Sequence, residues 1–408
     1  MLRSTLLDEP LPFASLEDTT LASLSSSGQA AQACSKEVAV GAQLSELDWS
    51  FAHRLKAPKI ESIHPYPAKF IGDIPATFLK VLPIPPDTAV MDPFCGSGTT
   101  LVEAQRAGRP SVGVDLNPIA CLISRVKTVP VATGFLAATA RLVSAAKHVR
   151  NAETPDIPNV DHWFKKEIQG AVAALAQVIV SPEYSPWYDQ LRLALSSILV
   201  RVSNQDSDTR YAAVNKGLKR DDVFTAFAVA AKKLNDALLG RDWSLTQSCV
   251  IEADILDVTA KQIPRGVGLV VTSPPYPNAY EYWLYHKYRM WWLGFDPLAV
   301  KEREIGARAH FFKKNHHTAE MFEAQMRSTL NLVNEVLVPG GYVCLVVGRS
   351  KIHGAVIDNG TMIYALGQQM GLRPVCKLER LINPSRKSFN LSHANIKTES
   401  VLVLEKPQ

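Results

Sequence analysis

The sequence predicts an α/β fold in which a doubly wound, parallel sheet of about seven strands carries a large helical insertion. Three observations support this prediction. Short apolar runs that end in an acidic residue alternate with helical stretches up to about residue 127. Between residues 128 and 246 only helical spacing remains, and strand signals resume from residue 247. Alternating strands and helices are typical of a parallel sheet with helices on both faces.

Two segments precede the first predicted strand. Residues 1–46 are rich in Ser, Ala and Leu, and we expect them to form a partly ordered arm. Organised sequence begins at residue 47 and leads to the motif His64-Pro65-Tyr66-Pro67-Ala68-Lys69-Phe70. The two prolines of this motif disfavour a regular helix, so an extended, exposed segment is expected.

The first strands and helices follow in alternation. Residues 89–92 form an apolar run ended by an acid and predict a strand. A glycine-containing turn and a helix over residues 101–106 come next, and Gly108 is expected to end that helix. Residues 111–115 predict the second strand, and Asn117-Pro118 predicts the start of another helix.

The rest of the chain completes the sheet after the insertion. Helical spacing covers residues 171–179, 191–200 and 223–239, and the stretch 201–222 is polar. Strands are predicted at residues 249–254, 268–272 and 342–347, followed by a hairpin with a long loop formed by residues 373–381 and 400–404. Pro339-Gly340-Gly341 is expected to be a turn that ends the preceding helix. The expected domains are one unit of residues 47–127 and 247–408 and a helical insertion of residues 128–246.

Composition narrows the class of protein. The 408 residues include 44 Lys and Arg against 39 Asp and Glu, a net charge of +5 that suits a polyanionic partner without establishing one. The six cysteines form no Cys-x-x-Cys pair, so neither a structural metal site nor a disulfide framework is expected. Asp8 and Glu9 interrupt any signal-peptide core, and no apolar run approaches the ~18 residues of a membrane helix. A soluble protein of a reducing compartment is expected.

The first motif with chemical content is Asp92-Pro93-Phe94-Cys95-Gly96-Ser97-Gly98-Thr99-Thr100. Its glycines allow a tight turn and a close approach of backbone to a ligand, and the following helix presents free N–H groups. Asp115 ends the next strand about 20 residues later, the separation expected of an acid that binds ribose hydroxyls. A third glycine and a P-loop lysine are both missing, so a turn with incidental glycines is the alternative.

The second motif is Thr272-Ser273-Pro274-Pro275-Tyr276, at the end of an apolar run. Consecutive prolines fix the backbone and leave carbonyl oxygens free to accept hydrogen bonds. A hydroxyl, a rigid carbonyl and an aromatic ring would together hold a planar base that bears an exocyclic amine. Because proline-rich turns are common, this motif alone is weak evidence for a binding site. Its position at the end of a strand, in the same sheet as the glycine loop, makes the evidence stronger.

Together these motifs resemble those of the amino-methylating DNA methyltransferases, and residues 64–70 resemble the segment that closes over the methionine end of S-adenosylmethionine in that family. The resemblance implies a class I methyltransferase (Rossmann-like) fold, with a seven-stranded sheet whose last strand is antiparallel. It also implies S-adenosylmethionine as cofactor and double-stranded DNA as partner, with a cognate restriction endonuclease as a further partner. A bacterial-type cytoplasmic, nucleoid-associated enzyme is expected.

The resemblance also assigns residues. Ser273, Pro274, Pro275 and Tyr276 are the expected catalytic residues. The expected cofactor-binding residues are Tyr66, Lys69, Phe70, Asp92, Phe94, Cys95, Gly96, Gly98, Asp115, Leu116, Asn117, Asp254 and Ile255.

The target is predicted to be N4 of a flipped-out cytosine, because the catalytic motif begins with Ser, whereas adenine enzymes more often have Asp or Asn there. A hydroxyl can also donate to N3 of cytosine beside the amine. The alternatives are an N6-adenine enzyme, an RNA methyltransferase and a non-catalytic nucleic-acid-binding relative. C5-cytosine methylation would need a nucleophilic cysteine, usually in a Pro-Cys pair, and this chain has no such pair. Cys95, which lies in the cofactor loop, is therefore expected to be a packing residue rather than a nucleophile.

Basic residues outside the motifs are candidate DNA contacts. They lie in the polar stretch of the insertion, in the loop near residue 313 and in the loop of residues 380–397, and comprise Arg201, Arg210, Lys216, Lys313, Lys314, Arg386 and Lys387. Helix capping or simple exposure is the alternative for each. The aromatic run of residues 280–292 is expected to be mostly core.

Overall fold

A computed structural model describes residues 39–52, 59–68, 71–208, 210–277, 281–311, 316–382 and 397–408. The chain divides into two compact units, Met1–Leu47 and Asp48–Gln408. In the first unit, residues 39–45 are helical. All other elements named below belong to the second unit.

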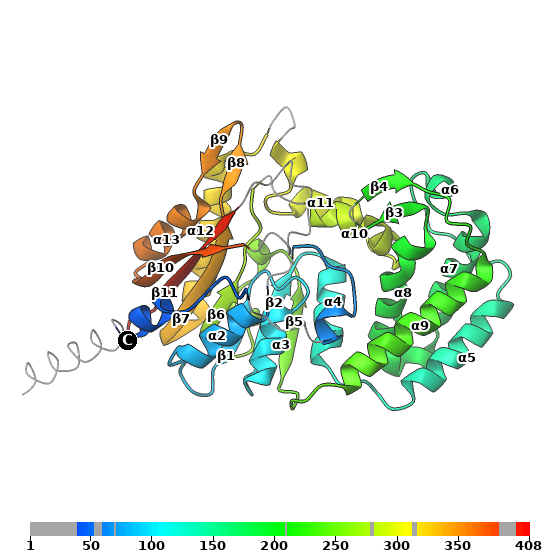
Figure 1. Ribbon diagram of the computed structural model, residues 1–408, viewed down its shortest axis with the longest axis horizontal. Helices are drawn as coiled ribbons and strands as arrows, with labels where there is room; N and C mark the ends of the chain where they lie inside the picture. The colour runs from blue at the N-terminus through cyan, green and yellow to red at the C-terminus, as the bar shows by residue number, and fades with distance from the viewer. Residues whose placement is uncertain are drawn as a thin grey trace, which may run out of the picture. The chain divides into compact units, whose positions relative to one another are not determined.

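In the described part of the chain, seven strands form one sheet in the order β10-β11-β7-β6-β1-β2-β5 (Figure 1). Their bounds are β1 Ala89–Asp92, β2 Ser111–Asp115, β5 Ser248–Glu252, β6 Val267–Thr272, β7 Leu337–Gly348, β10 Arg373–Leu381 and β11 Thr398–Glu405. Within this sheet β11 runs antiparallel to both of its neighbours, β10 and β7, and all other neighbouring pairs are parallel. The predicted mostly parallel α/β sheet, its antiparallel last strand and the hairpin of β10 with β11 are confirmed.

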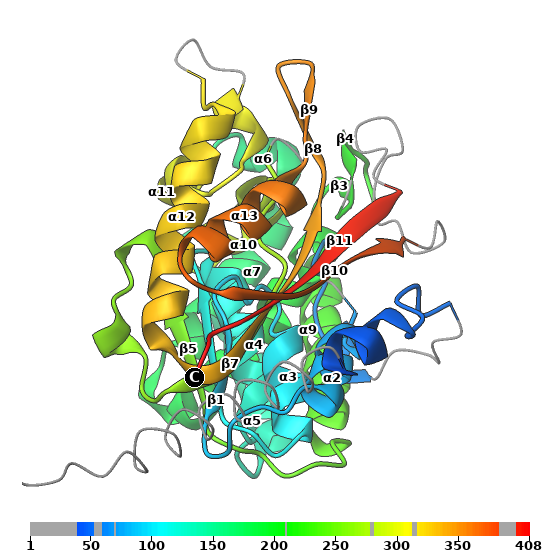
Figure 2. The same cartoon turned by 90° about the vertical axis from the view of Figure 1, so that its left-hand side faces the viewer.

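Helices cover both faces of the sheet (Figures 1 and 2). They are α2 Asp73–Val81, α3 Thr99–Arg106, α4 Pro118–Thr128, α12 Ala319–Val336 and α13 Asn359–Gln369, with 3-10 turns at η1 Lys59–Ser62, η3 Ile255–Asp257, η4 Ala260–Gln262 and η5 Arg308–Phe311. The short helix α11 Pro297–Arg303 packs instead against α10 Tyr282–Trp292. One hydrophobic cluster joins α12 and α13 to the sheet through residues such as Val343, Leu345 and Leu330. The central strands β1, β2 and β6 are buried on both faces, which explains why their sequences are apolar runs, whereas the edge strands β5 and β10 are mostly half-buried or exposed.

The insertion is helical, as predicted, and packs as a second hydrophobic cluster. Its elements are α5 Phe135–His148, α6 Val160–Trp163, α7 Lys166–Ile179, η2 Pro182–Trp187, α8 Tyr188–Val202 and α9 Arg220–Leu239. Helix α10, Tyr282–Trp292, follows the catalytic motif in sequence but contributes Trp283, Tyr288 and Trp292 to this cluster. These three aromatic residues are core, whereas Tyr282, Tyr285 and Trp291 are half-buried. The division of Asp48–Gln408 into a main domain and an insertion remains a prediction.

Two local expectations were wrong. Pro339-Gly340-Gly341 lies inside β7 rather than in a turn before it, because the pairing of β7 with β6 shifts register there and Gly340 adopts φ +73°. The polar stretch after α8 contains a small hairpin, β3 Gln205–Ser207 with β4 Arg210–Ala213. A second unexpected hairpin pairs β8 Ser350–Ile352 with β9 Ala355–Ile357.

Within the described residues, none of the helices is long and apolar enough to span a membrane. No group of His, Cys, Asp or Glu side chains in that part of the chain is arranged to hold a metal ion.

Candidate functional site

The glycine loop connects β1 to α3 at the carboxyl edge of the sheet. Gly96 and Gly98 have φ values of +49° and +76°, a region that side-chain-bearing residues rarely adopt. A Cβ on Gly96 would lie 3.1 Å from the hydroxyl oxygen of Tyr66, and one on Gly98 would lie 2.7 Å from Oγ of Ser124. Both backbone conformation and space therefore require glycine at these two positions.

Asp115 lies at the carboxyl end of β2, next to this loop. Its carboxylate accepts one hydrogen bond from the N–H of Gly96 and one from the N–H of Asn117, each at 2.8 Å. Burial raises the pKa of Asp115 to about 6. A carboxylate has about four acceptor positions, so Asp115 orders the loop and keeps acceptors free for a ligand.

Two polar groups in the same region lack partners. Oγ of Ser97 and Nδ2 of Asn117 are buried without a hydrogen-bond partner among the described residues. The Asn117 oxygen is engaged, because it accepts the N–H of Ile119 as the cap of α4. Native proteins rarely leave buried donors unpaired, so these groups are suited to a bound ligand or water.

Tyr66 packs against the glycine loop at Gly96. Its ring stacks on Tyr282 with centroids 5.8 Å apart and lies 5.2 Å from the ring of His286. Burial raises the pKa of Tyr66 well above its ordinary value and Asp115 adds to the shift, so the phenol stays neutral. The predicted proximity of the upstream segment to the glycine loop is thus observed at Tyr66. Lys69 and Phe70 lie outside the described residues.

The motif Ser273-Pro274-Pro275-Tyr276 is joined to the glycine loop through Asp92. Because β1 and β6 are neighbouring parallel strands, their carboxyl ends meet at one edge of the sheet. The hydroxyl of Thr272 donates to Oδ1 of Asp92 at 2.6 Å, and the N–H of Phe94 donates to the same oxygen at 3.1 Å. Burial raises the pKa of Asp92 to about 6.

A hydrogen-bonded chain extends from Ser273 across the motif. Oγ of Ser273 lies 3.3 Å from the hydroxyl oxygen of Tyr276, and the Tyr276 hydroxyl donates to Oε1 of Glu399 at 2.9 Å. Glu399 forms an ion pair with Arg380 at 2.7 Å. The sequence did not single out Glu399, which follows Tyr276 by 123 residues and belongs to no motif. Arg380, the first residue of the expected basic loop, is buried in this ion pair rather than exposed.

Glu304 is a second acid that the sequence did not reveal. It is buried and accepts hydrogen bonds from the N–H groups of Tyr282 at 2.8 Å and Trp283 at 2.7 Å, which caps the start of α10. Burial raises the pKa of Glu304 to about 8. Because Tyr282 stacks on Tyr66, this cap fixes one wall of the site.

The remaining expected cofactor residues differ in burial and in hydrogen-bond partners. Asp254 follows β5, accepts the N–H of Leu256 and forms an ion pair with Arg303 at 3.0 Å. Ile255 is buried and Leu116 is half-buried. Cys95 is buried and burial raises the pKa of its thiol, which agrees with a packing role. Contact of Asp254, Ile255, Leu116 and Asn117 with adenine remains a prediction.

The candidate DNA contacts of the insertion lie at one end of α8. Arg201 and Arg210 are exposed, and Arg210 lies 3.8 Å from Asp206. Lys216 instead donates to the carbonyl oxygen of Val200 at 2.9 Å, so its ammonium group caps α8. The other candidates, Lys313, Lys314, Arg386 and Lys387, lie outside the described residues.

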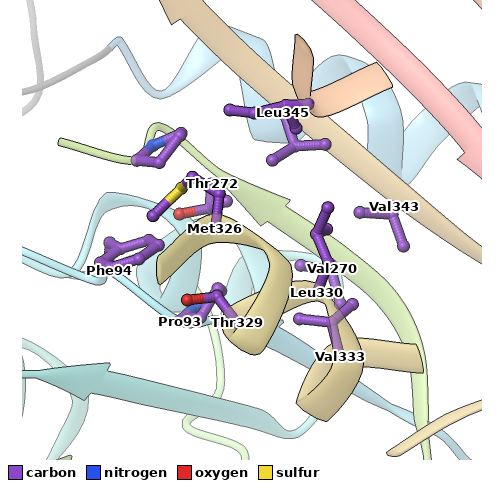
Figure 3. A pocket seen from close by; sticks show the side chains of 12 residues that line it. Pro93, Phe94, Val270, Thr272, Met326, Thr329, Leu330, Val333, Val343 and Leu345 are labelled. Atoms are coloured by element: carbon purple, nitrogen blue, oxygen red, sulfur yellow. The ribbon is translucent and has the colours of Figure 1, made fainter. Parts of the chain in front are cut away.

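An apolar cavity lies behind the two motifs, on the side of the sheet covered by α12 (Figure 3). Pro93, Phe94 and Pro274 line it from the motifs, and Met326, Leu330 and Val333 line it from α12. None of its lining residues is charged, so it is a packing gap beneath the motifs and offers no ion pair to a charged cofactor.

The donor set beside the glycine loop fits S-adenosylmethionine. This cofactor carries positive charge on its sulfur and amino group, and the buried carboxylate of Asp92 and the half-buried carboxylate of Asp115 supply negative charge beside the loop. Asp115 keeps free acceptors for the ribose, and Ser97 and Asn117 present unpaired polar groups. The missing side chain at Gly96 lets the Tyr66 ring approach the backbone of the loop.

Comparison with known proteins finds a family match over residues 46–125. The N6/N4 methylase family model, described as DNA methylase, matches residues 46–125. The type II methyltransferase M.MjaII of Methanocaldococcus jannaschii is 41% identical over 87 residues, which cover 20% of this chain and 16% of that protein. M.MvaI of Kocuria varians is 32% identical over 26% of each chain. M.BsoBI of Geobacillus stearothermophilus is 23% identical over 60% of this chain and 56% of its own.

The chain therefore spans between 16% and 56% of the length of these curated relatives. Among solved structures, the rRNA methyltransferase AviRa of Streptomyces viridochromogenes is 12% identical with a TM-score of 0.34, over 88% of this chain and 94% of that one. The fold class is therefore assigned from the strand order of the sheet and not from this similarity. The family match supports S-adenosylmethionine as the cofactor. Over residues 46–125 the predicted resemblance is confirmed, and this segment is similar to the DNA amino-methyltransferases.

Proposed function

We propose that this protein is an S-adenosylmethionine-dependent DNA methyltransferase that methylates the exocyclic N4 of cytosine. One observation carries the proposal. The hydrogen bond from Thr272 to Asp92, 2.6 Å long, joins the strand end that bears Ser273-Pro274-Pro275-Tyr276 to the glycine loop that fits the cofactor. This bond supports the proposal, in which the acceptor for the target amine and the site for the methyl donor lie at the same edge of the sheet.

In this proposal the chain's own residues position the reacting nitrogen. The lone pair of an exocyclic amine is delocalised into the base, which makes the amine a poor nucleophile. Hydrogen bonds from the amine to Ser273 and to the carbonyl oxygen of Pro274 would hold it toward tetrahedral geometry. S-adenosylmethionine supplies a methyl group on a positively charged sulfur. Positioning converts a bimolecular encounter into a local step, which accounts for much of the expected rate.

In this proposal the ring of Tyr276 supports the base. It packs against Gly348 of β7, where a Cβ would lie only 2.7 Å from Cε2 of the ring. Its hydroxyl is fixed by Glu399, and burial raises its pKa well above the ordinary value, so the phenol stays neutral. A neutral ring held in one orientation offers a stacking surface to a base that has left the duplex.

Cytosine is preferred to adenine because the catalytic motif begins with Ser273. This preference rests on the resemblance to serine-type motifs alone. A cognate restriction endonuclease and a cytoplasmic, nucleoid-associated location are further proposals that follow from the same resemblance.

Nucleoside mass spectrometry of DNA from cells that express the protein tests the proposal. N4-methylcytosine is the expected product, and Ser273→Ala should abolish most of it while S-adenosylmethionine affinity stays within about twofold. N6-methyladenine in place of N4-methylcytosine would overturn the base assignment. Labelled cofactor supplied with duplex DNA or RNA extends the test, because label in RNA alone would show an RNA methyltransferase and label in neither would show a non-catalytic binder.

A further inference from the structure

We propose that Glu399 fixes the direction of a short hydrogen-bond relay, Ser273 to Tyr276 to Glu399, and thereby makes Ser273 an acceptor for the target amine. This inference rests on the proposed function and adds two positioning residues, Tyr276 and Glu399, to it. A serine hydroxyl can donate or accept, whereas an amine held by hydrogen bonds through its N–H groups needs an acceptor. Ser273 therefore needs a second group that accepts the hydrogen bond from its own hydroxyl.

The charge at the far end of the relay sets its direction. Glu399 forms an ion pair with Arg380 at 2.7 Å, and Nε of Arg380 also donates to the carbonyl oxygen of Trp49 at 3.1 Å. Arg380 is buried, so the pair is shielded from water. Held as a carboxylate, Glu399 can only accept hydrogen bonds.

The middle of the relay follows from that. The Tyr276 hydroxyl oxygen lies 2.9 Å from Oε1 of Glu399 and 3.4 Å from the carbonyl oxygen of Val346. The carboxylate is both closer and charged, so it takes the phenol proton. The Tyr276 oxygen then has only lone pairs to offer to Ser273, whose Oγ lies 3.3 Å away.

Ser273 consequently donates its proton to Tyr276 and keeps its own lone pairs for the substrate. The relay lets a serine do what a carboxylate or amide oxygen would do at this place, which is to accept a hydrogen bond from the amine. It also replaces the donation from Ser273 to N3 of cytosine that the sequence suggested. The base preference then has to come from the rest of the pocket.

Backbone register explains how these groups meet. Glu399 of β11 lies opposite Gly348 of β7, and Arg380 of β10 lies opposite Glu399. Gly348 admits the Tyr276 ring because it has no Cβ. The same pair of residues therefore receives both the ring of Tyr276 and its hydroxyl.

A double-mutant cycle tests the relay in the full-length protein. Tyr276→Phe removes only the hydroxyl and leaves the Glu399–Arg380 pair, and Glu399→Gln introduces a side chain that can donate as well as accept. Each variant should lower kcat about tenfold, with the S-adenosylmethionine Kd within about twofold of the parent. The double variant should be no slower than Tyr276→Phe, because Glu399 acts only through the hydroxyl.

Glu379→Gln is the matched control, since Glu379 lies on the same hairpin in an exposed ion pair with Arg349 and should leave kcat unchanged. Losses that multiply to about a hundredfold in the double variant would overturn the relay, as would a fully active Tyr276→Phe. Because Glu399→Gln breaks a buried ion pair, melting curves must accompany the kinetics. If that variant fails to fold, Tyr276→Phe and the neutron map described next decide the matter.

A second measurement determines the direction of the hydrogen bonds in the relay and does not depend on enzymatic activity. Neutron diffraction from deuterated crystals should place one deuterium on Ser273 pointing to Tyr276 and one on Tyr276 pointing to Glu399. The opposite arrangement, with the Tyr276 deuterium pointing to Ser273, would overturn the relay even in an active enzyme. A parent protein that methylates neither DNA nor RNA would instead overturn the proposed function, and the neutron map would still report the relay by itself.

Discussion

The pKa of Glu304 predicts a pH dependence of stability that one substitution should remove. Burial raises this pKa from an ordinary 4.5 to about 8. Below pH 4.5 the carboxyl is protonated in both the folded and the unfolded chain. As pH rises toward 8 the unfolded chain loses this proton while the folded chain keeps it, so the free energy of unfolding decreases. Above about pH 8 both forms are ionised and the decrease ends.

The size of the effect follows from the difference in pKa. At about 1.4 kcal/mol per pKa unit, the decrease between about pH 6.5 and 8 amounts to roughly 2 kcal/mol. With an unfolding entropy of about 2.1 cal/mol/K per residue, a chain of 408 residues should lose about 2 °C in Tm over this window. Asp92 and Asp115, whose pKa values are about 6, titrate mostly below it.

Melting curves of the parent and of Glu304→Gln between pH 6.5 and 8 measure this decrease. Glutamine cannot ionise, and its side-chain oxygen can still accept an N–H at the start of α10, so its profile should lack the 2 °C fall. Glu302→Gln is the control, because Glu302 is an exposed residue of α11, two positions away. Parallel profiles for the parent and Glu304→Gln would refute the reasoning.

Three further predictions concern the cofactor, the base and the DNA. Asp115→Ala should weaken S-adenosylmethionine binding at least tenfold in calorimetric titration, because hydrogen bonds to a charged acceptor contribute about 1.5–3 kcal/mol. Gly348→Ala should displace the Tyr276 ring, since the new Cβ would lie 2.7 Å from Cε2, and should lower kcat about tenfold while cofactor affinity stays unchanged. Replacing Arg386 and Lys387 by Ala should weaken duplex binding and reduce its salt slope by about one per lost phosphate contact.

Each of these predictions has a control. Asp115→Asn retains one acceptor oxygen and should bind the cofactor better than Asp115→Ala does. Gly170→Ala adds a Cβ inside α7 that meets only the flexible end of Arg220, so kcat should not change. Arg141→Ala removes an exposed charge from α5 and should leave the salt slope unaltered if binding is confined to the expected loops. Unchanged affinity in Asp115→Ala, normal turnover in Gly348→Ala or an unchanged slope in the loop variant would contradict the respective prediction.

Most of the sheet could be predicted because the residues of each strand form a recognisable apolar pattern on their own. A strand buried on both faces is expected to be an almost continuous apolar run, and Ala89–Asp92 and Val267–Thr272 are polar only at their last residue. The hairpin of β3 and β4 carries polar residues without alternation, so its sequence resembles a loop. Pro339-Gly340-Gly341 has the composition of a turn, and only the shifted pairing with β6 shows that the strand continues through it.

The motif residues of the site were also predictable, because each motif is contiguous and lies at a strand end. Asp92 and Asp115 follow apolar runs whose carboxyl ends meet in any parallel sheet. Glu304 could not be found in this way. It lies in a charged segment at the end of α11 that reads as surface, and only its backbone partners, the N–H groups of Tyr282 and Trp283, reveal that it is buried.

Glu399 shows why the sequence cannot supply the whole site even when the topology is anticipated. Parallel strands bring their last residues to the catalytic edge, so an acid at the start of a strand is normally at the wrong end. Strand β11 is antiparallel, and its first residues therefore lie beside the last residues of β7, with Glu399 opposite Gly348. The expected antiparallel strand thus implies that some residue near position 399 faces the catalytic motif. Which residue does so depends on the register, because a slip of one position would turn Glu399 to the other face of the sheet, away from Tyr276.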